Sequence, residues 1–199
     1  MKNLKITIFT LLLGTAWVNA QNQTFDAFSK SYTLEAEGKY KESLASLENV
    51  PDGYAVQLRR AWLNYSQKAY LQAKAQYLLA IAKEPKSIEA RLGLINALSA
   101  LEQYEDAAKV YREILAIDAN HSTSNYWLAY HYFLKKEFDK AEPLLQRLIA
   151  LYPFDFDGNV LLAQVYLNRG KINEAKRLYN LALMYNPSRS DLKEVLEKL

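Results

Sequence analysis

The chain has 199 residues, of which 50% are hydrophobic and 24% charged, with a formal net charge of +3 and no cysteine. The apolar content is too high for a disordered chain, and the length suffices for a domain with its own core. The absence of cysteine excludes disulfides, thiolate metal sites, cysteine nucleophiles and a lipid-modified cysteine.

The first 20 residues have the pattern of a secretory signal. Two lysines precede an apolar run over residues 6–13, and small residues occupy positions 18 and 20, ahead of Gln21. The run is shorter than the roughly 20 residues that cross a bilayer. We therefore expect cleavage after Ala20 and export of a bacterial protein to the periplasm, or its secretion, without a membrane span. The alternative, a buried N-terminal helix, is disfavoured because the run is not amphipathic.

Without this segment, the charges of the chain are almost balanced. Removing Lys2 and Lys5 leaves 23 basic and 22 acidic residues. Nucleic-acid binding needs a concentrated basic surface, because phosphate contacts supply most of the affinity. Arg59-Arg60 and Lys135-Lys136 are isolated pairs beside acids, which we interpret as solvated faces. We expect no nucleic-acid partner.

Residues 24–53 have the pattern of two short helices. The first is expected over residues 25–37 and ends at a turn around Gly38. The second is expected over residues 41–49 and ends at Pro51-Asp52-Gly53.

From residue 54 the sequence repeats with a period of 34. Four sets of residues recur every 34 positions, and we call each set a column; the first is the alanine column. They are Ala73, Ala107, Ala141 and Ala175; Pro85, Ala119, Pro153 and Pro187; Tyr70, Tyr104, Phe138 and Ile172; and Tyr77, Tyr111, Leu145 and Tyr179. Columns that stay in phase predict an array of repeats, with boundaries at 54–87, 88–121, 122–155 and 156–189.

Each repeat is predicted to be an antiparallel pair of helices. In the last repeat, helical spacing over residues 160–168 is followed by a break at Gly170 and a second run that ends at Asn186-Pro187. Alanine marks the crossing of the two helices, where a small side chain permits close approach. Pro143 is expected near the start of a second helix, where a missing N–H costs least. Residues 190–199 are expected to form a capping helix with Ser190 as its N-cap.

The period, the helix pair and the signature positions resemble the tetratricopeptide repeat family. In the last repeat the resemblance is carried by Leu162, Ala163, Tyr166, Gly170, Ala175, Tyr179, Ala182 and Pro187. Residues 24–53, with Ser43 in the alanine column, resemble a shortened first repeat, whereas Arg60 and Asn64 depart from the family pattern. The resemblance implies an all-α fold, a right-handed α-solenoid of antiparallel helix pairs with a C-terminal capping helix, forming one domain over residues 21–199.

The resemblance also implies a concave groove, lined by four positions of the first helix of each repeat, that binds an extended or helical segment of a partner. The residues that we select for this groove are Phe28, Tyr32, Trp62, Tyr65, Asn96, Tyr126, Tyr130, Phe133 and Gln164. Three of the four positions are spaced i, i+4, i+7, which is one stripe of a helix. Residues 126–134 are apolar or aromatic on every side of their helix, so we expect a partner or the chain itself to cover them. Chaperone-binding relatives clamp a terminal carboxylate with lysines and asparagines of the groove. In this chain only Asn96 resembles such a residue.

The sequence offers no catalytic or metal-binding arrangement. His121 and His131 have no second ligand at helical spacing, and the glycines are scattered singly. Ser190 to Lys193 matches a short nucleophile motif of penicillin-interacting enzymes, but its companion motifs are missing. We therefore expect no enzyme, no cofactor and no metal.

Two functional hypotheses remain. The first is an interaction scaffold that holds a partner protein or peptide in an aromatic, weakly charged groove, within an envelope assembly or secretion complex. The second is a structural envelope protein that associates with itself to form oligomers.

Overall fold

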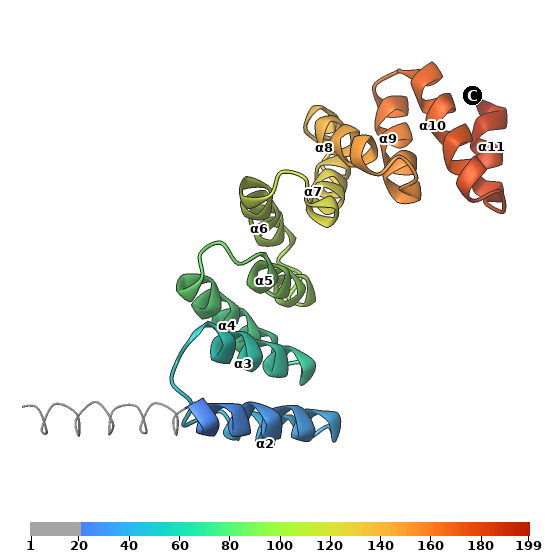
Figure 1. Ribbon diagram of the computed structural model, residues 1–199. Coiled ribbons are helices and arrows are strands. Elements are labelled where there is room, and N and C mark those ends of the chain that lie inside the picture. The colour runs from blue at the N-terminus through green and yellow to red at the C-terminus, as the bar shows by residue number, and fades with distance from the viewer. Residues whose placement is uncertain (1–20) are drawn as a thin grey trace, which may run out of the picture. The chain divides into compact units, whose positions relative to one another are not determined.

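The computed structural model of the chain describes residues 21–199 (Figure 1). Over these residues it contains helices and turns and no strand, which confirms the predicted all-α class. A helix over residues 21–36 is followed by α2 (Tyr40–Ala45), α3 (Tyr54–Ser66), α4 (Tyr70–Lys83), α5 (Ile88–Ala100), α6 (Tyr104–Ile117), α7 (Ser122–Leu134), α8 (Phe138–Leu151), α9 (Phe156–Asn168), α10 (Ile172–Tyr185) and α11 (Ser190–Lys198). The predicted signal, Met1–Ala20, lies outside the described residues.

The helices keep the 34-residue step of the sequence columns. The first helices of the repeats, α3, α5, α7 and α9, have 13 residues each, and the second helices, α4, α6, α8 and α10, have 14. Each second helix begins at the column of Tyr70 and ends two residues before the column of Pro85. Proline cannot continue a helix and disfavours helical geometry in the residue before it, so this column separates the repeats.

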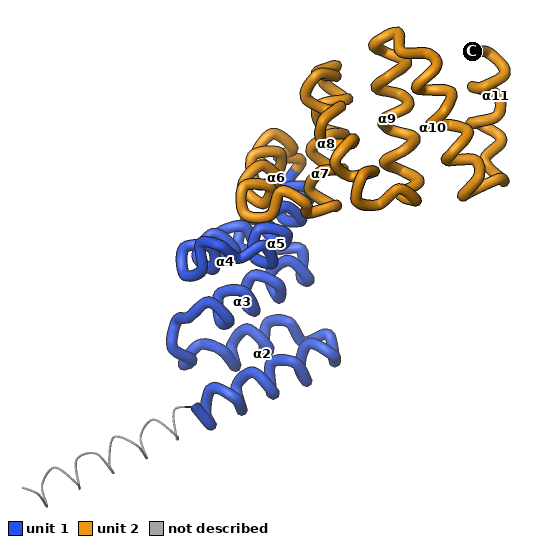
Figure 2. The backbone as a smooth tube through the Cα atoms, turned by 45° about the horizontal axis from the view of Figure 1, so that its top comes forward, with its two compact units in different colours: residues 1–101 blue, residues 102–199 orange. Residues whose placement is uncertain are grey.

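The alanine column lies at the centre of the packing. Ala73, Ala141 and Ala175 are fully buried, and Ala107 is 4% exposed. Two compact units divide the chain: an N-terminal unit that ends at Leu101 and a C-terminal unit that begins at Glu102 (Figure 2). In the N-terminal unit α3 packs on α4 and α4 on α5, and in the C-terminal unit α6 to α11 each pack on the next helix along the chain.

The turns inside the repeats share one backbone conformation. Lys68, Glu102, Lys136 and Gly170 have φ values of 65°, 58°, 59° and 73°. They occupy one column of the 34-residue period. The left-handed conformation reverses the chain between the two helices, and among the four full repeats only the last has glycine in this column.

Helix α2 is shorter than predicted. The sequence predicted a helix over residues 41–49, whereas α2 ends at Ala45 and turns occupy residues 46–49. The Ser46 hydroxyl donates to the Ser43 carbonyl at 2.7 Å, and the amide of Leu47 donates three residues back, to Leu44. These bonds replace the i to i−4 ladder, so the helix tightens and stops.

Two further local predictions were wrong. Ser190 is the first residue of α11 and not its N-cap; Arg189 holds that position, and its side chain binds Asp191 instead of capping the helix. Pro143 lies in the second turn of α8, which begins at Phe138, and not near its start. In the second turn each backbone N–H normally donates to the carbonyl four residues back, so Pro143 removes one such hydrogen bond.

Candidate functional site

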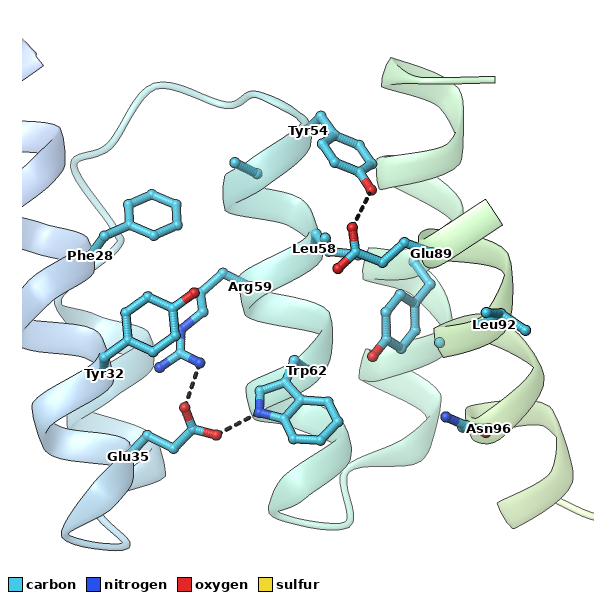
Figure 3. Close-up of a pocket in the computed structure, with 13 residues that line it drawn as sticks. Phe28, Tyr32, Glu35, Tyr54, Leu58, Arg59, Trp62, Glu89, Leu92 and Asn96 are labelled. Atoms are coloured by element: carbon cyan, nitrogen blue, oxygen red, sulfur yellow. Dashed lines mark hydrogen bonds and ion pairs between the residues drawn. The ribbon is translucent and has the colours of Figure 1, made fainter. Parts of the chain in front are cut away.

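A pocket of about 530 Å³ opens on the N-terminal unit, between the helix over residues 21–36, α3 and α5 (Figure 3). We call it the N-terminal pocket. Each of the three helices contributes one stripe of side chains, spaced so that they share a face. The stripes are Phe28, Tyr32 and Glu35; Ala55, Leu58 and Trp62; and Glu89, Leu92 and Asn96.

A buried ion pair fixes the first wall of the pocket. Arg59 is 6% exposed, and its guanidinium donates through Nη1 to Glu35 and through Nε to the Ser31 hydroxyl, at 3.0 Å in the second case. The same guanidinium lies 3.8 Å from the centre of the Tyr32 ring. The other oxygen of Glu35 accepts from the indole N–H of Trp62 (Figure 3). These contacts hold both aromatic rings in place although each ring remains partly exposed.

The opposite wall is built around two tyrosines. The Tyr54 hydroxyl lies 2.8 Å from the Ser87 hydroxyl and donates to Glu89 at 3.2 Å, and burial raises the pKa of Tyr54. Tyr77 is 3% exposed, and burial raises its pKa to about 12. A Cβ at Gly93 would lie 2.2 Å from the Tyr77 ring, so the absence of a side chain at Gly93 lets this ring pack against α5.

The structure brings Phe28, Tyr32, Trp62 and Asn96, all selected from the sequence, around this one pocket. Tyr65 is not part of the lining. The centre of its ring lies 6.2 Å from the ring centre of Trp62 and 5.6 Å from that of Tyr70.

Four lining residues lie outside the groove positions of the repeat and were missed by the sequence reasoning: Tyr54, Arg59, Tyr77 and Gly93. Arg59 was interpreted as part of a solvated face, which is wrong, because its charge is buried against Glu35. The available signal was its position beside Leu58, which the repeat pattern places in the groove.

The other predicted aromatic residues lie on α7 in the C-terminal unit. Tyr126 and Tyr130 stack with their ring centres 6.5 Å apart and their planes at 6°. Trp127 meets both rings edge-on, at 5.3 and 5.8 Å. Phe133 packs 5.8 Å from Phe138, at the start of α8. We call Tyr126, Trp127 and Tyr130 the α7 aromatic cluster.

The α7 aromatic cluster is only partly covered. Trp127 is 46% exposed, Tyr130 36% and Leu134, at the end of the same helix, 61%. Trp127 was not among the residues selected from the sequence, because it lies outside the four groove positions. Gln164, the last predicted residue, is half-buried on α9, which contacts α7.

The two histidines have structural partners. His121 is the N-cap of α7, where its imidazole accepts from the amide of Ser124 at 3.2 Å. His131 lies 3.5 Å from Glu105, which also binds Lys135 at 2.7 Å. Within residues 21–199 no three ligating side chains gather in a way that could hold a metal ion, and none of the helices there has the length and apolarity of a membrane span.

Comparison with known proteins identifies the repeat. Two family models, both described as tetratricopeptide repeat, match residues 92–156 and 132–199 and together span more than half of the chain. A search of curated protein sequences gives no match.

Solved structures share the fold. A tetratricopeptide repeat protein from Parabacteroides merdae superposes with a TM-score of 0.74 at 20% identity, over 88% of this chain and 71% of its own. A crystal structure of MamA gives 0.71 at 16% identity, over 86% and 96%. MamA from Desulfovibrio magneticus gives 0.68 at 15% identity, over 84% and 97%. On the family models and this shared fold, the chain belongs to the tetratricopeptide repeat family.

Proposed function

We propose that this protein is a non-enzymatic scaffold that binds a segment of a partner protein on the groove side of its first helices. The tetratricopeptide repeat is a protein–protein interaction scaffold. The N-terminal pocket supports a binding role for this chain, since Trp62 and Tyr32 are partly exposed and yet held by Glu35 and Arg59. Aromatic anchors dominate many interfaces, and fixing them beforehand lowers the entropy lost on binding.

We further propose that the protein acts outside the cytoplasm, in an envelope assembly or secretion complex. The support is the signal-like pattern of residues 1–20. N-terminal sequencing of the protein recovered from fractionated cells tests this. A chain that begins at Gln21 in the envelope fraction is expected, and a chain that begins at Met1 in the cytosol would contradict it.

The binding role is tested with Trp62→Ala and Tyr130→Ala, introduced separately and together. Each variant and the unaltered protein are used as bait for affinity capture from the cell envelope, after circular dichroism and urea unfolding have shown that the variants fold. We expect a partner captured by the unaltered protein to be lost or depleted at least about tenfold with the double variant. Tyr152→Ala is the control, because Tyr152 is 51% exposed and lies outside the groove positions. Undiminished capture by the double variant would refute the groove.

Self-association is the second candidate function. Phe154 and Met184 are 73% and 75% exposed, and the Phe154 ring packs 4.9 Å from Tyr185, which leaves an apolar surface on the C-terminal unit. Light scattering across a concentration series decides the question. A monomer at every concentration excludes this function.

A further inference from the structure

We propose that the N-terminal pocket receives an arginine side chain of the partner segment, an inference that rests on the proposed function and specifies the chemistry of its ligand. Three observations lead to it: unmatched negative charge, aromatic faces at the opening, and a native arginine already held in the same way.

The charge of the lining is unbalanced. It contains two carboxylates, Glu35 and Glu89, and one cation, Arg59. Arg59 is committed to Glu35. Glu89 accepts a hydrogen bond from the Tyr54 hydroxyl, and over residues 21–199 no cationic side chain pairs with it. An incoming cation would therefore meet a carboxylate that the protein leaves unpaired.

The one cation of the pocket is not placed to bind an anion. Arg59 Nη2 has no hydrogen-bond partner, but this atom exposes less than 1 Å² and the guanidinium lies against the Tyr32 ring. A carboxylate would reach this buried nitrogen only if the side chains around it moved. The unsatisfied nitrogen is therefore not a ligand site, and the accessible charge of the pocket is negative.

The aromatic rings at the opening suit a guanidinium. Tyr32 is 57% exposed and Trp62 45%, and the Trp62 indole is tethered through its N–H to Glu35 (Figure 3). Guanidinium groups stack on such rings and pair with carboxylates, and their methylene stems pack on apolar side chains. Leu58 and Leu92 also line the pocket and offer that apolar surface.

Arg59 shows that this environment holds a guanidinium. Its own group stacks on Tyr32 at 3.8 Å while it pairs with Glu35. Trp62 and Glu89 offer the same two elements, a ring and a carboxylate, and both residues are exposed. The pocket volume of about 530 Å³ also leaves room for an apolar neighbour of the arginine in the partner segment.

The experiment compares three peptides that differ at one residue: acetyl-Leu-Arg-Leu-amide, the same peptide with neutral, isosteric citrulline, and the same peptide with glutamate. Binding is followed in NMR spectra of the ¹⁵N-labelled protein through the indole N–H of Trp62, assigned with Trp62→Phe. We expect the arginine peptide to bind about tenfold more tightly than the citrulline peptide, as a cation–π contact and a partly exposed ion pair together provide. Higher salt should reduce this difference in affinity, because salt screens the ion pair.

Glu89→Gln keeps an acceptor for Tyr54 and removes the charge, so the preference for arginine should fall to about threefold or less. The matched control is Glu48→Gln, an exposed acid outside the pocket, which should keep the full preference. Equal binding of the arginine and citrulline peptides, tighter binding of the glutamate peptide, or no response of Trp62 to any peptide would each overturn the inference. The proposed function is tested separately, by affinity capture with the Trp62→Ala and Tyr130→Ala variants, and none of these peptide results decides that experiment.

Discussion

Within the repeats, four turn residues adopt the left-handed conformation, and three of them carry a side chain: Lys68, Glu102 and Lys136. Such a conformation costs a non-glycine residue about 1 kcal/mol or more, whereas glycine adopts it freely. The fourth, Gly170, shows the arrangement without this cost. The helix pairs of this chain thus tolerate a small strain at three of these four turns.

Lys136→Gly should therefore stabilise the protein. The relieved strain exceeds the entropy that glycine adds to the unfolded chain, so we expect the free energy of unfolding to rise by roughly 0.5 kcal/mol. The reciprocal change, Gly170→Ala, should lower it by about 1 kcal/mol. Lys193→Gly, inside α11, is the control and should be destabilising. Urea denaturation measures all three, and a loss of stability in Lys136→Gly would contradict the prediction.

Gly93→Ala should disturb the wall of the N-terminal pocket. Its Cβ would meet a buried tyrosine ring, Tyr77, at 2.2 Å, and a rigid ring cannot give way as a flexible chain end does. Overpacking costs about 1 to 3 kcal/mol, and alanine returns roughly 1 kcal/mol in a helix, so we expect a net loss of stability of up to about 2 kcal/mol. Tyr77→Leu in the same chain should recover part of this loss, and strictly additive effects in urea unfolding would argue against the clash.

At the scale of elements, a buried polar cluster joins the helix over residues 21–36 to α2 and α3. Ser31 and Ser43 are fully buried with their hydroxyls 2.8 Å apart, and Ser43 also donates to the Ser31 carbonyl at 2.7 Å. Arg59 adds its bond to Ser31 and its pair with Glu35. Ser43 occupies the alanine column, so the short first repeat replaces an apolar crossing with hydrogen bonds.

Arg59→Met should loosen this first repeat. Without the guanidinium, Glu35 keeps only its bond from Trp62 and Ser31 only its bonds with Ser43. Breaking a buried ion pair in this way typically costs about 3 kcal/mol. The double variant Arg59→Met with Glu35→Leu should regain most of the stability, because no charge is left uncompensated. Lys140→Met removes an exposed pair with Glu137 and should cost less than about 1 kcal/mol. Urea unfolding measures these changes. Equal losses of stability in Arg59→Met and Lys140→Met would show that the buried polar cluster does not stabilise the first repeat.

The sequence determined the elements where local signals were strong. The columns of Ala73 and Pro85 identified the helix pairs, because crossing points and helix ends require those residue types. The end of α2 was not predictable, since it depends on the Ser46 hydroxyl replacing part of the helical ladder. Phe28, Tyr32, Trp62 and Asn96 followed from the groove positions that the family resemblance implies. Arg59 and Tyr77 did not, because their placement is set by contacts with other helices.

At the scale of the whole molecule, one buried and one half-buried tyrosine make stability depend on pH. Burial raises the pKa of Tyr77 and of Tyr111 to about 12, one in each unit, from an ordinary value of 10.0. Above pH 10 the unfolded chain releases protons that the folded chain retains, so the free energy of unfolding should fall between pH 10 and 12, by up to about 3 kcal/mol for Tyr77 and by less for the half-buried Tyr111.

Tyr77→Phe with Tyr111→Phe should flatten this alkaline decline, as measured by urea unfolding at pH 8, 10 and 11. Tyr104→Phe, at a position that is 58% exposed, is the control and should leave the decline unchanged. The prediction fails if the double variant loses stability as steeply as the unaltered protein.

Protection against hydrogen exchange should follow how many residues each helix buries. Helix α9 buries seven residues, whereas α2 and α11 bury one each, Ser43 and Leu192. Because each helix packs chiefly on its neighbours, opening is expected to begin at these weakly packed helices. Amide exchange followed by mass spectrometry should be fastest in α2 and α11 and slowest in α9.

Leu192→Ala should speed exchange in α10 and α11 and leave α3 and α4 unchanged, because the cavity that it creates weakens contacts only at the C-terminal end of the array. Equal acceleration in α3 would show that the array opens as one cooperative body instead.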